Sequence, residues 1–478
     1  MGWVRERLLV EPPRPRRVAE SRWAAWLTVA TVSVGAFMGQ LDASIVNLAY
    51  PSIQHAFGAS LGAVQWVGLA YLSVLISTVA AVGRVADMLG RKLLYTYGFL
   101  VFGIGSALCA AAPTLLALDA FRALQAIGAV LLQANSVAII ASSLPPGRLG
   151  RGIGAQGTAQ ALGLGFGPLV GGLLIGLAGW RLIFLVNVPI SLVGVVTAWL
   201  FVPRSRGLSA HEPFDWVGLT LFVPALLSLL LALSFGNERG WTSAEVVSLI
   251  AVASATAAAF LLHEKATRHP LIHLGLFRRR RFSIGVGSSL LSFLVLFGVL
   301  FVAPFYLERG RGASAASAGL IVSVLPLAMA LAAPLSGRAV DRVGARLPTG
   351  IGMLVAAAGC LLALQRPGGL MGLAGGLAIC GVGVGLFTPA NSAAMMASVS
   401  ERRIGVASGV LNLTRGMGTA LGLSLTALVF DVGTGGAGTP VAVVRGFTHA
   451  LAFLAAAAIV AASLALLRRP FAEEHRPA

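Results

Sequence analysis

The chain has 478 residues, of which 57% are hydrophobic and 11% charged, and it carries a net charge of +18 at pH 7. Soluble domains contain about 25% charged residues, so this composition excludes an ordinary soluble protein and indicates an integral membrane protein. The three cysteines Cys109, Cys360 and Cys380 lie in apolar runs at unrelated spacings, which indicates neither a disulfide framework nor a metal site.

Apolar runs of about 20 residues, the length that crosses a bilayer as a helix, predict an all-α protein with fourteen spans. We expect them at roughly 24–47, 64–83, 93–112, 114–139, 153–177, 182–202, 214–235, 244–263, 282–306, 316–336, 347–366, 368–392, 404–430 and 446–467. The connections between them are too short for a soluble catalytic domain. An even number of spans puts both ends of the chain on the same side of the membrane.

The positive charge is unevenly distributed between the two sides of the predicted membrane protein. If the N-terminus is cytoplasmic, the tails and alternate loops on that side carry most of the 35 lysines and arginines. This asymmetry predicts that both termini lie in the cytoplasm. The charge is therefore explained by membrane topology, and we expect no nucleic-acid partner.

No sequence pattern of an energy-coupling enzyme is present. The chain has no Gly-Lys-Ser/Thr phosphate loop, no His-Glu-x-x-His helix and no Cys-x-x-Cys pair. The histidines His211, His263, His269 and His273 are close in sequence without metal-ligand spacing, and we expect them in a solvated loop. The sequence predicts no enzyme, cofactor or metal.

The first span contains an acidic residue, Asp42. Ionisable groups in a bilayer cost about 2.5–3.5 kcal/mol on insertion scales, so those present are functional candidates. An apolar environment disfavours a charged carboxylate, which suits a group that binds and releases a proton. The alternative is a fixed hydrogen-bond acceptor that holds neighbouring helices together. The spacing alone leaves both interpretations open.

A short signature follows the second span and recurs in the second half of the chain. Its copies are Gly83 to Lys92 and Gly337 to Arg346, and both place Gly, Asp and Gly at the same offsets. A tight, charged turn between two membrane helices, repeated once per half, indicates a transporter built from two related halves.

The fourth span contains Asp119 and Arg122, three residues apart and on the same helix face. A buried arginine keeps its charge and needs a partner. Asp119 is one candidate partner; alternatively, Arg122 faces a central cavity and tunes a proton-carrying carboxylate. Arg415 lies in the thirteenth span, whereas Asp215 and Asp431 lie at span ends, where capping is the simpler role.

The fifth span has glycines at every fourth position, Gly163, Gly167 and Gly171, followed by Gly172. This spacing leaves one helix face bare, so that another helix can approach closely. Pro168 removes a backbone donor and bends the helix. We expect a close helix contact that also limits ion leak.

These segments resemble the motifs of the drug:proton antiporter group of the major facilitator superfamily with fourteen spans. Asp42 to Pro51 resembles its first-span motif, Asp-x-Thr-x-x-Asn-x-Ala-x-Pro, with Ser44 in the threonine position. Gly83 to Lys92 resembles its loop signature, with Met88 where a basic residue is usual.

The resemblance extends through the other motifs in order. Arg122, Gln125 and Gly128 match the fourth-span motif, with Ala126 in place of a glycine. Gly163 to Gly172 resembles the antiporter motif, and Trp180 to Pro189 resembles the stretch that follows it. Together the similarity covers the chain from Trp23 to about Leu467.

The resemblance implies two six-helix bundles of inverted repeats with two extra central helices. The expected parts are an N-terminal tail (1–23), a first bundle (24–203), a linker with the extra helices (204–281), a second bundle (282–467) and a C-terminal tail (468–478). It also implies residue roles. Asp42, with Arg122 and Asp119, is the candidate proton-coupling group. A conformational latch is implied at Gly83, Asp87, Gly90 and Arg91, with a weaker second latch at Asp341 and Arg346.

The function implied is a proton-coupled multidrug exporter in a bacterial cytoplasmic membrane, working by alternating access. We expect a monomer in the lipid bilayer that exchanges protons for amphipathic small molecules. The polar or aromatic residues inside spans are candidates for a substrate cavity: Gln40, Asn47, Tyr71, Gln133, Asn135, Gln156, Gln160, Phe301, Asn391, Asn412 and Arg415. The alternatives are an importer or metabolite carrier on the same scaffold, and a receptor or assembly subunit that does not transport. The sequence leaves open whether Asp431 takes part in coupling.

Overall fold

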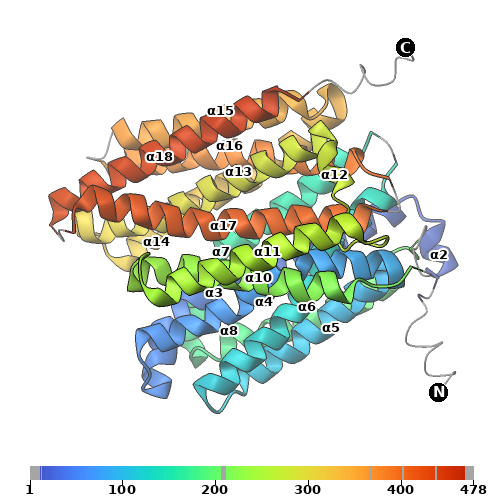
Figure 1. The fold of residues 1–478 in the computed structure, drawn as a ribbon, viewed down its shortest axis with the longest axis horizontal. Coiled ribbons are helices and arrows are strands. Elements are labelled where there is room, and N and C mark those ends of the chain that lie inside the picture. Colours follow the sequence, from blue (N-terminus) through green and yellow to red (C-terminus); the bar gives the residue numbers. More distant parts are fainter. Residues whose placement is uncertain are drawn as a thin grey trace. The chain divides into compact units, whose positions relative to one another are not determined.

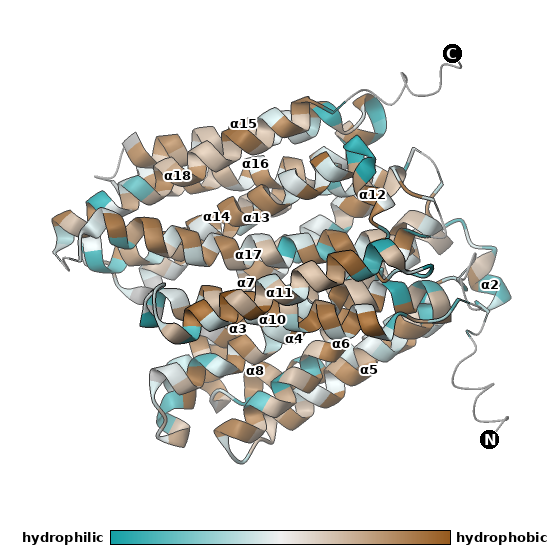
Figure 2. Cartoon of the chain, viewed as in Figure 1, coloured by the Kyte–Doolittle hydropathy of each residue, from teal (hydrophilic) through white to brown (hydrophobic). Residues whose placement is uncertain are grey.

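The computed structural model describes residues 11, 13–145, 147–205, 212–365, 369–400, 403–436 and 439–468. Throughout these residues the regular structure is helical. Fourteen of the described helices are long and apolar enough to cross a membrane, which confirms the predicted all-α architecture and number of spans. Figure 2 shows hydrophobic residues along the helices and hydrophilic residues gathered near their ends.

The contacts divide the chain into two compact units. Most of the first unit consists of the helices up to Phe201. They are α2 (Arg16–Ala19), α3 (Ala24–Phe57), α4 (Leu61–Leu89), α5 (Arg91–Ala110), α6 (Leu115–Ser143), α7 (Leu149–Ala178), α8 (Leu182–Leu185) and α9 (Asn187–Phe201).

Most of the second unit follows residue 275. It contains α12 (Gly275–Arg278), α13 (Arg280–Phe305), the π-helix η1 (Tyr306–Gly310), α14 (Ala315–Val343), α15 (Arg346–Gln365), α16 (Leu370–Ala397) and α18 (Pro440–Leu466). Three helices contribute residues to both units: α10 (Trp216–Arg239), α11 (Ala244–Ala266) and α17 (Ile404–Thr434). Within the second unit, α15 packs against α16 and α18, and the three lie side by side in Figure 1.

Local sequence signals set several helix ends. The side chains of Ser60, Thr114 and Thr439 accept hydrogen bonds from backbone N–H groups in the first turns of α4, α6 and α18, as N-caps do. Gly58 ends α3 with φ of 60°, a left-handed conformation that favours glycine. Gly90, at φ 113°, is the single residue between α4 and α5.

Two predicted boundaries differ from the structure. The first span, expected to end near residue 47, continues as α3 through Pro51 to Phe57. Proline is tolerated there because its missing N–H removes only one hydrogen bond of a helix held by tertiary packing. The sixth span, expected as one helix, is interrupted at Val186 into α8 and α9.

The glycines of α7 lie against α3 in the first unit. A Cβ atom added at Gly163 would collide with the Phe37 carbonyl oxygen, and one added at Gly167 would collide with Ser44 Oγ. At Gly171 the added atom would lie 2.7 Å from Ile45 Cγ1. Gly172, by contrast, has no neighbour within 4 Å of such an atom. The three glycines spaced by four residues therefore form the face on which α3 and α7 meet.

We predict that Gly163→Ala destabilises the protein by about 1–3 kcal/mol, because the methyl group must displace the α3 backbone. Gly176→Ala is the matched control, since Gly176 lies on the same helix with open space around it. Thermal unfolding of both variants in detergent measures the difference. An unchanged midpoint for Gly163→Ala would contradict the close contact.

Candidate functional site

Asp42 lies at the centre of a buried polar cluster in the first unit and is 0% exposed. Its Oδ2 accepts a hydrogen bond from Arg122 Nη1 at 2.7 Å. Its Oδ1 accepts from Gln125 Nε2 and from Asn187 Nδ2, both at 2.9 Å. The carboxylate therefore holds α3, α6 and α9 together through three donors.

Arg122 is equally buried, at 1% exposure, and its guanidinium is well partnered. Besides Asp42, it donates to the Val67 carbonyl oxygen at 3.1 Å and to Gln125 Oε1 at 2.6 Å. The Tyr71 ring lies 4.2 Å from the guanidinium carbon, within cation–π range. Each of these contacts stabilises a charge that a bilayer would otherwise exclude.

The structure distinguishes between the two partners that the sequence left open for Arg122. The ion pair forms with Asp42, on another helix. Asp119 is half-buried, and its Oδ1 has no hydrogen-bond partner in the described part of the chain. The i,i+3 spacing therefore did not determine the pairing.

Buried apolar side chains of the first unit lie next to these polar residues, in contact with Arg122 at Val67 and Phe184. They include Ile45 and Val46 from α3, Val67 from α4, and Ile183 and Phe184 from α8. All five residues are at most 1% exposed. Asp42 is therefore enclosed by protein in this conformation.

A second polar site joins the end of α4 to the start of α17. Asp87 Oδ1 accepts from Arg91 Nη2 at 2.7 Å. Its two carboxylate oxygens also accept from the backbone N–H groups of Gly405 and Val406, each at 3.0 Å. A carboxylate at these free N–H groups is favoured by the helix dipole as well as by the hydrogen bonds.

Glycines allow the close approach of these two helices. A Cβ atom at Gly83 would lie 2.5 Å from the Gly405 carbonyl oxygen, and one at Gly409 would lie 2.9 Å from Ala80 Cα. The predicted latch residues Gly83, Asp87 and Arg91 are thus brought together at one helix contact.

Glu11, in the segment predicted only as a tail, contributes to the same region. It is 4% exposed and accepts from the backbone N–H of Lys92 at 2.9 Å, in the first turn of α5. It also accepts from Ser205 Oγ at 2.8 Å. Glu11 occupies the space beside Gly90, where any Cβ atom would collide with its carboxylate. The tail has three glutamates, Glu6, Glu11 and Glu20, so its sequence does not single out Glu11 for this contact.

Arg84 and the histidines in and after the last turn of α11 form a further polar cluster in the first unit. Arg84 Nη2 donates to Glu212 Oε2 at 2.5 Å, and His269 Nδ1 lies 3.9 Å from the same oxygen. His263 Nε2 lies 2.8 Å from Asp215 Oδ1. Three of the histidines expected in a solvated loop are therefore partly enclosed; the fourth, His211, lies outside the described residues.

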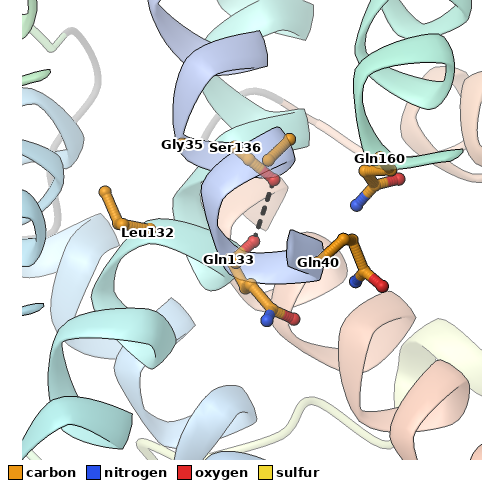
Figure 3. A pocket seen from close by; sticks show the side chains of 8 residues that line it. Gly35, Gln40, Leu132, Gln133, Ser136 and Gln160 are labelled. Atoms are coloured by element: carbon orange, nitrogen blue, oxygen red, sulfur yellow. Dashed lines mark hydrogen bonds between the residues drawn. The ribbon is translucent and has the colours of Figure 1, made fainter. Parts of the chain in front are cut away.

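Three of the predicted cavity residues line one small pocket within the first unit. Gln40 from α3, Gln133 from α6 and Gln160 from α7 surround it together with Ser136. Figure 3 shows the side chains of Gln40 and Gln133 extending in the same direction, with Gln160 beside them. Asn412 Nδ2 donates to the Gln133 carbonyl oxygen at 2.9 Å.

Other predicted cavity residues are used inside the protein. Tyr71 faces Arg122. Asn135 and Gln156 are at most 1% exposed and donate to Leu131 O and Ser136 Oγ. The side chain of Asn47 lies outside the described part of the structure.

The remaining predicted residues lie in the second unit. Asn391 accepts from Arg468 Nη2 at 2.8 Å and donates to the Gly285 carbonyl oxygen at 2.9 Å, so its amide links α16 to α13. Arg346 Nε donates to the Leu466 carbonyl oxygen at 2.9 Å. Arg415 donates to Ser392 Oγ, and the Phe301 ring contacts the Phe305 ring. The role of Asp341 and Arg346 as a second latch stays a prediction.

Comparison with known proteins identifies the family. The sequence profile of the Major Facilitator Superfamily matches residues 32–307 and 286–478. The chain belongs to the major facilitator superfamily. Members of this superfamily are membrane transporters, so a small-molecule substrate and a bilayer environment follow from the assignment.

Several relatives of this superfamily member are bacterial. The multidrug resistance protein Stp of Mycobacterium tuberculosis is 32% identical over 84% of this chain and 74% of its own length. The riboflavin transporter RibZ of Clostridioides difficile is 32% identical over 85% of this chain and 88% of its own. The tetracenomycin C resistance and export protein of Streptomyces glaucescens is 31% identical over 86% and 78%. The chain is a multi-pass protein of a bacterial plasma membrane.

Solved structures agree on the superfamily fold. The human organic anion transporter MFSD10 superimposes with a TM-score of 0.67 at 16% identity, covering 92% of this chain and 99% of its own. The proton:xylose symporter XylE gives a TM-score of 0.66 at 15% identity, covering 92% and 94%. At this level of identity the similarity concerns the fold alone.

We predict that Asp87→Asn accelerates amide hydrogen exchange at Gly405 and Val406, because the variant loses the charge that caps α17 and turns an N–H₂ group toward backbone donors. Asp341→Asn, in the second copy of the signature, is the matched control. Exchange measured by mass spectrometry in detergent distinguishes the two. Unchanged protection of the first turn of α17 in Asp87→Asn would contradict the capping role.

His273 gives the protein a predicted acid sensitivity. Burial, together with the positive charges of Arg403 and Arg84, lowers the pKa of the His273 side chain to about 4. In the unfolded chain histidine titrates near pH 6.5. The stability associated with neutral His273 is therefore fully present above pH 6.5 and is lost as the pH falls toward 4.

We expect His273→Gln to make the unfolding midpoint less dependent on pH between 7 and 5 than it is in the wild type, since glutamine cannot be protonated. His55→Gln, at an exposed position of α3, is the control. Thermal unfolding across this pH range tests the prediction. Parallel pH profiles for His273→Gln and the wild type would contradict it.

Proposed function

We propose that this protein is a proton-coupled multidrug exporter that exchanges protons for amphipathic compounds by alternating access. The observation that carries the proposal is the fully buried ion pair between Asp42 and Arg122. A paired carboxylate inside a membrane protein can change its charge only when a proton and a rearrangement arrive together. The names of two relatives, a multidrug resistance protein and a tetracenomycin C resistance and export protein, support efflux as the transport direction.

The contacts of Asp42 suggest how the coupling works. With the proton absent, the carboxylate accepts from Arg122, Gln125 and Asn187, and these bonds tie α3 to α6 and α9. A proton on Asp42 removes the negative charge and leaves the Arg122 guanidinium without its counter-ion. The resulting imbalance favours a different arrangement of these helices. Protonation of Asp42 and the conformational change are then thermodynamically linked, so that each shifts the equilibrium of the other.

In this proposal the Asp87 contact stabilises one end state of the cycle. Its hydrogen bonds to α17 exist only while α4 and α17 are in contact. Breaking them leaves two backbone donors and a carboxylate without partners. These hydrogen bonds therefore stabilise the state in which α4 and α17 are in contact. Release of the proton from Asp42 and re-formation of this contact would return the transporter to its starting conformation.

The charge distribution supports one orientation of the protein in the membrane. The excess of arginine and lysine on one set of loops favours cytoplasmic termini. The proton gradient of a bacterial plasma membrane drives protons inward, and in an antiporter this movement drives the substrate outward. We infer a monomer as the transporting form, since each chain carries both the coupling group and the latch.

The second candidate is a metabolite carrier on the same scaffold, favoured by the relative named as a riboflavin transporter. The two functions predict different results with a panel of unrelated drugs. A multidrug exporter uses the proton gradient to export several of them, whereas a metabolite carrier transports none. A receptor or assembly subunit would move no compound at all.

We predict that Asp42→Asn abolishes drug-triggered proton movement, because asparagine cannot carry the proton. The measurement uses inverted membrane vesicles, a pH-sensitive dye and a panel of cationic, neutral and anionic drugs. In the wild type, addition of a substrate should dissipate the pH gradient. Glu245→Gln, an acid exposed near the start of α11, is the control and should behave as the wild type.

Amounts of folded protein are compared by fluorescence-detected size-exclusion chromatography, so that loss of coupling is not confused with loss of protein. Drug-triggered proton movement at the wild-type level in Asp42→Asn would contradict the assignment of Asp42 as the proton carrier. Proton-independent movement of a single metabolite by the wild type would favour the second candidate.

A further inference from the structure

The second unit contains a buried arginine that the fold leaves incompletely partnered. Arg415, on α17, is 7% exposed, and its Nη2 donates to Ser392 Oγ at 2.7 Å. Its Nε is buried without a hydrogen-bond partner among the described residues. Within that same part of the chain, no carboxylate lies within ion-pair distance of Arg415.

Ser392 cannot neutralise this charge. Its hydroxyl donates to the Thr388 carbonyl oxygen at 2.7 Å, so toward Arg415 it acts only as a neutral acceptor. The pair thus fixes the direction of the guanidinium while leaving donors available.

Arg122 and Arg415, both buried in membrane spans, differ sharply in this respect. Arg122 has a carboxylate, a carbonyl oxygen, an amide oxygen and an aromatic ring around it. Arg415 has one hydroxyl and the Phe293 ring, at 5.4 Å from its guanidinium carbon. A buried guanidinium without a counter-ion is costly in a membrane protein. Its presence indicates that an anionic group completes the site.

A row of phenylalanines begins beside Arg415. Phe293, Phe297, Phe301 and Phe305 are spaced by four residues on α13 and so follow one face of the helix. All four are only partly buried. The rings of Phe293 and Phe297 stack with centroids 6.2 Å apart, and those of Phe301 and Phe305 lie 5.1 Å apart. This row offers an aromatic surface that starts at the positive charge.

We propose that Arg415 binds the acidic group of the transported substrate and that the phenylalanine row of α13 holds its aromatic body. The substrate class is an amphipathic aromatic anion. A carboxylate or sulfonate can accept two hydrogen bonds from the planar guanidinium, which gives both charge neutralisation and orientation. This inference rests on the proposed function, because it names the substrate class of the same transporter, yet it does not depend on proton coupling.

Binding to the purified protein tests the proposal without any proton gradient. The probes are 2-naphthoate and 2-naphthamide, which share a ring system and differ in charge. Thermal stabilisation in detergent is titrated with each compound for the wild type, Arg415→Gln, Arg415→Lys and Arg445→Gln. Arg445 is the control because it belongs to the same unit and donates to the Gly433 and Thr434 carbonyl oxygens.

We expect the wild type to respond to the acid at a concentration at least about ten-fold lower than to the amide, as charge-assisted hydrogen bonds provide. Arg415→Gln should lose this preference while its response to the amide stays the same. Arg415→Lys keeps the charge without the planar fork, so a reduced preference for the acid should remain. Arg445→Gln should retain the full preference.

Equal responses of the wild type to the acid and the amide would overturn the proposal, even if Arg415→Gln fails to fold. An acid preference that persists in Arg415→Gln would overturn it as well. The proposed function is judged separately by the vesicle assay. Drug-triggered proton movement with neutral or cationic compounds alone would support antiport while rejecting an anionic substrate.

Discussion

The first unit depends on one constraint, which is the need to keep a carboxylate and a guanidinium together where water cannot reach them. Asp42 and Arg122 come from helices far apart in sequence, and Gln125 and Asn187 complete the shell of the carboxylate. Removing one member would leave a buried charge without compensation, which costs more than the pair itself contributes. The positions of α3, α6 and α9 are therefore linked to the charge state of a single group.

The same principle operates at the end of α4, where Asp87 pairs with the buried Arg91 of α5 and also accepts hydrogen bonds from free backbone N–H groups. Asp87 caps the first turn of α17, and Glu11 caps the first turn of α5. Helix starts carry unsatisfied N–H groups and a partial positive charge, so a carboxylate is stabilised at either place. Two short acidic side chains thus connect three helices and the N-terminal segment.

Much of this arrangement could be predicted from the sequence, because apolar length and charge position are properties of the chain itself. Fourteen spans and the glycine face of α7 follow from spacing, and Asp42 is conspicuous as an acid in an apolar run. The partner of Arg122 could not be predicted, because the i,i+3 spacing offered Asp119 and the sequence does not show that α3 brings Asp42 to the guanidinium. Asn187 lies within the motif-like segment Trp180 to Pro189, but nothing in that segment identified it as a partner of Asp42. Its role depends on the break at Val186 that starts α9. Pro189 favours that break, because it has no N–H to bond the Leu185 carbonyl oxygen.

The contact between Glu11 and Gly90 has a consequence for how the sequence of this protein can change. A side chain at position 90 would occupy the space of the Glu11 carboxylate, in addition to straining the backbone at φ 113°. The steric part of that penalty vanishes if position 11 is small, whereas the backbone part remains. The two positions are therefore epistatic although 79 residues separate them. Among related sequences, an exchange at the glycine is tolerable mainly after the acid has been lost.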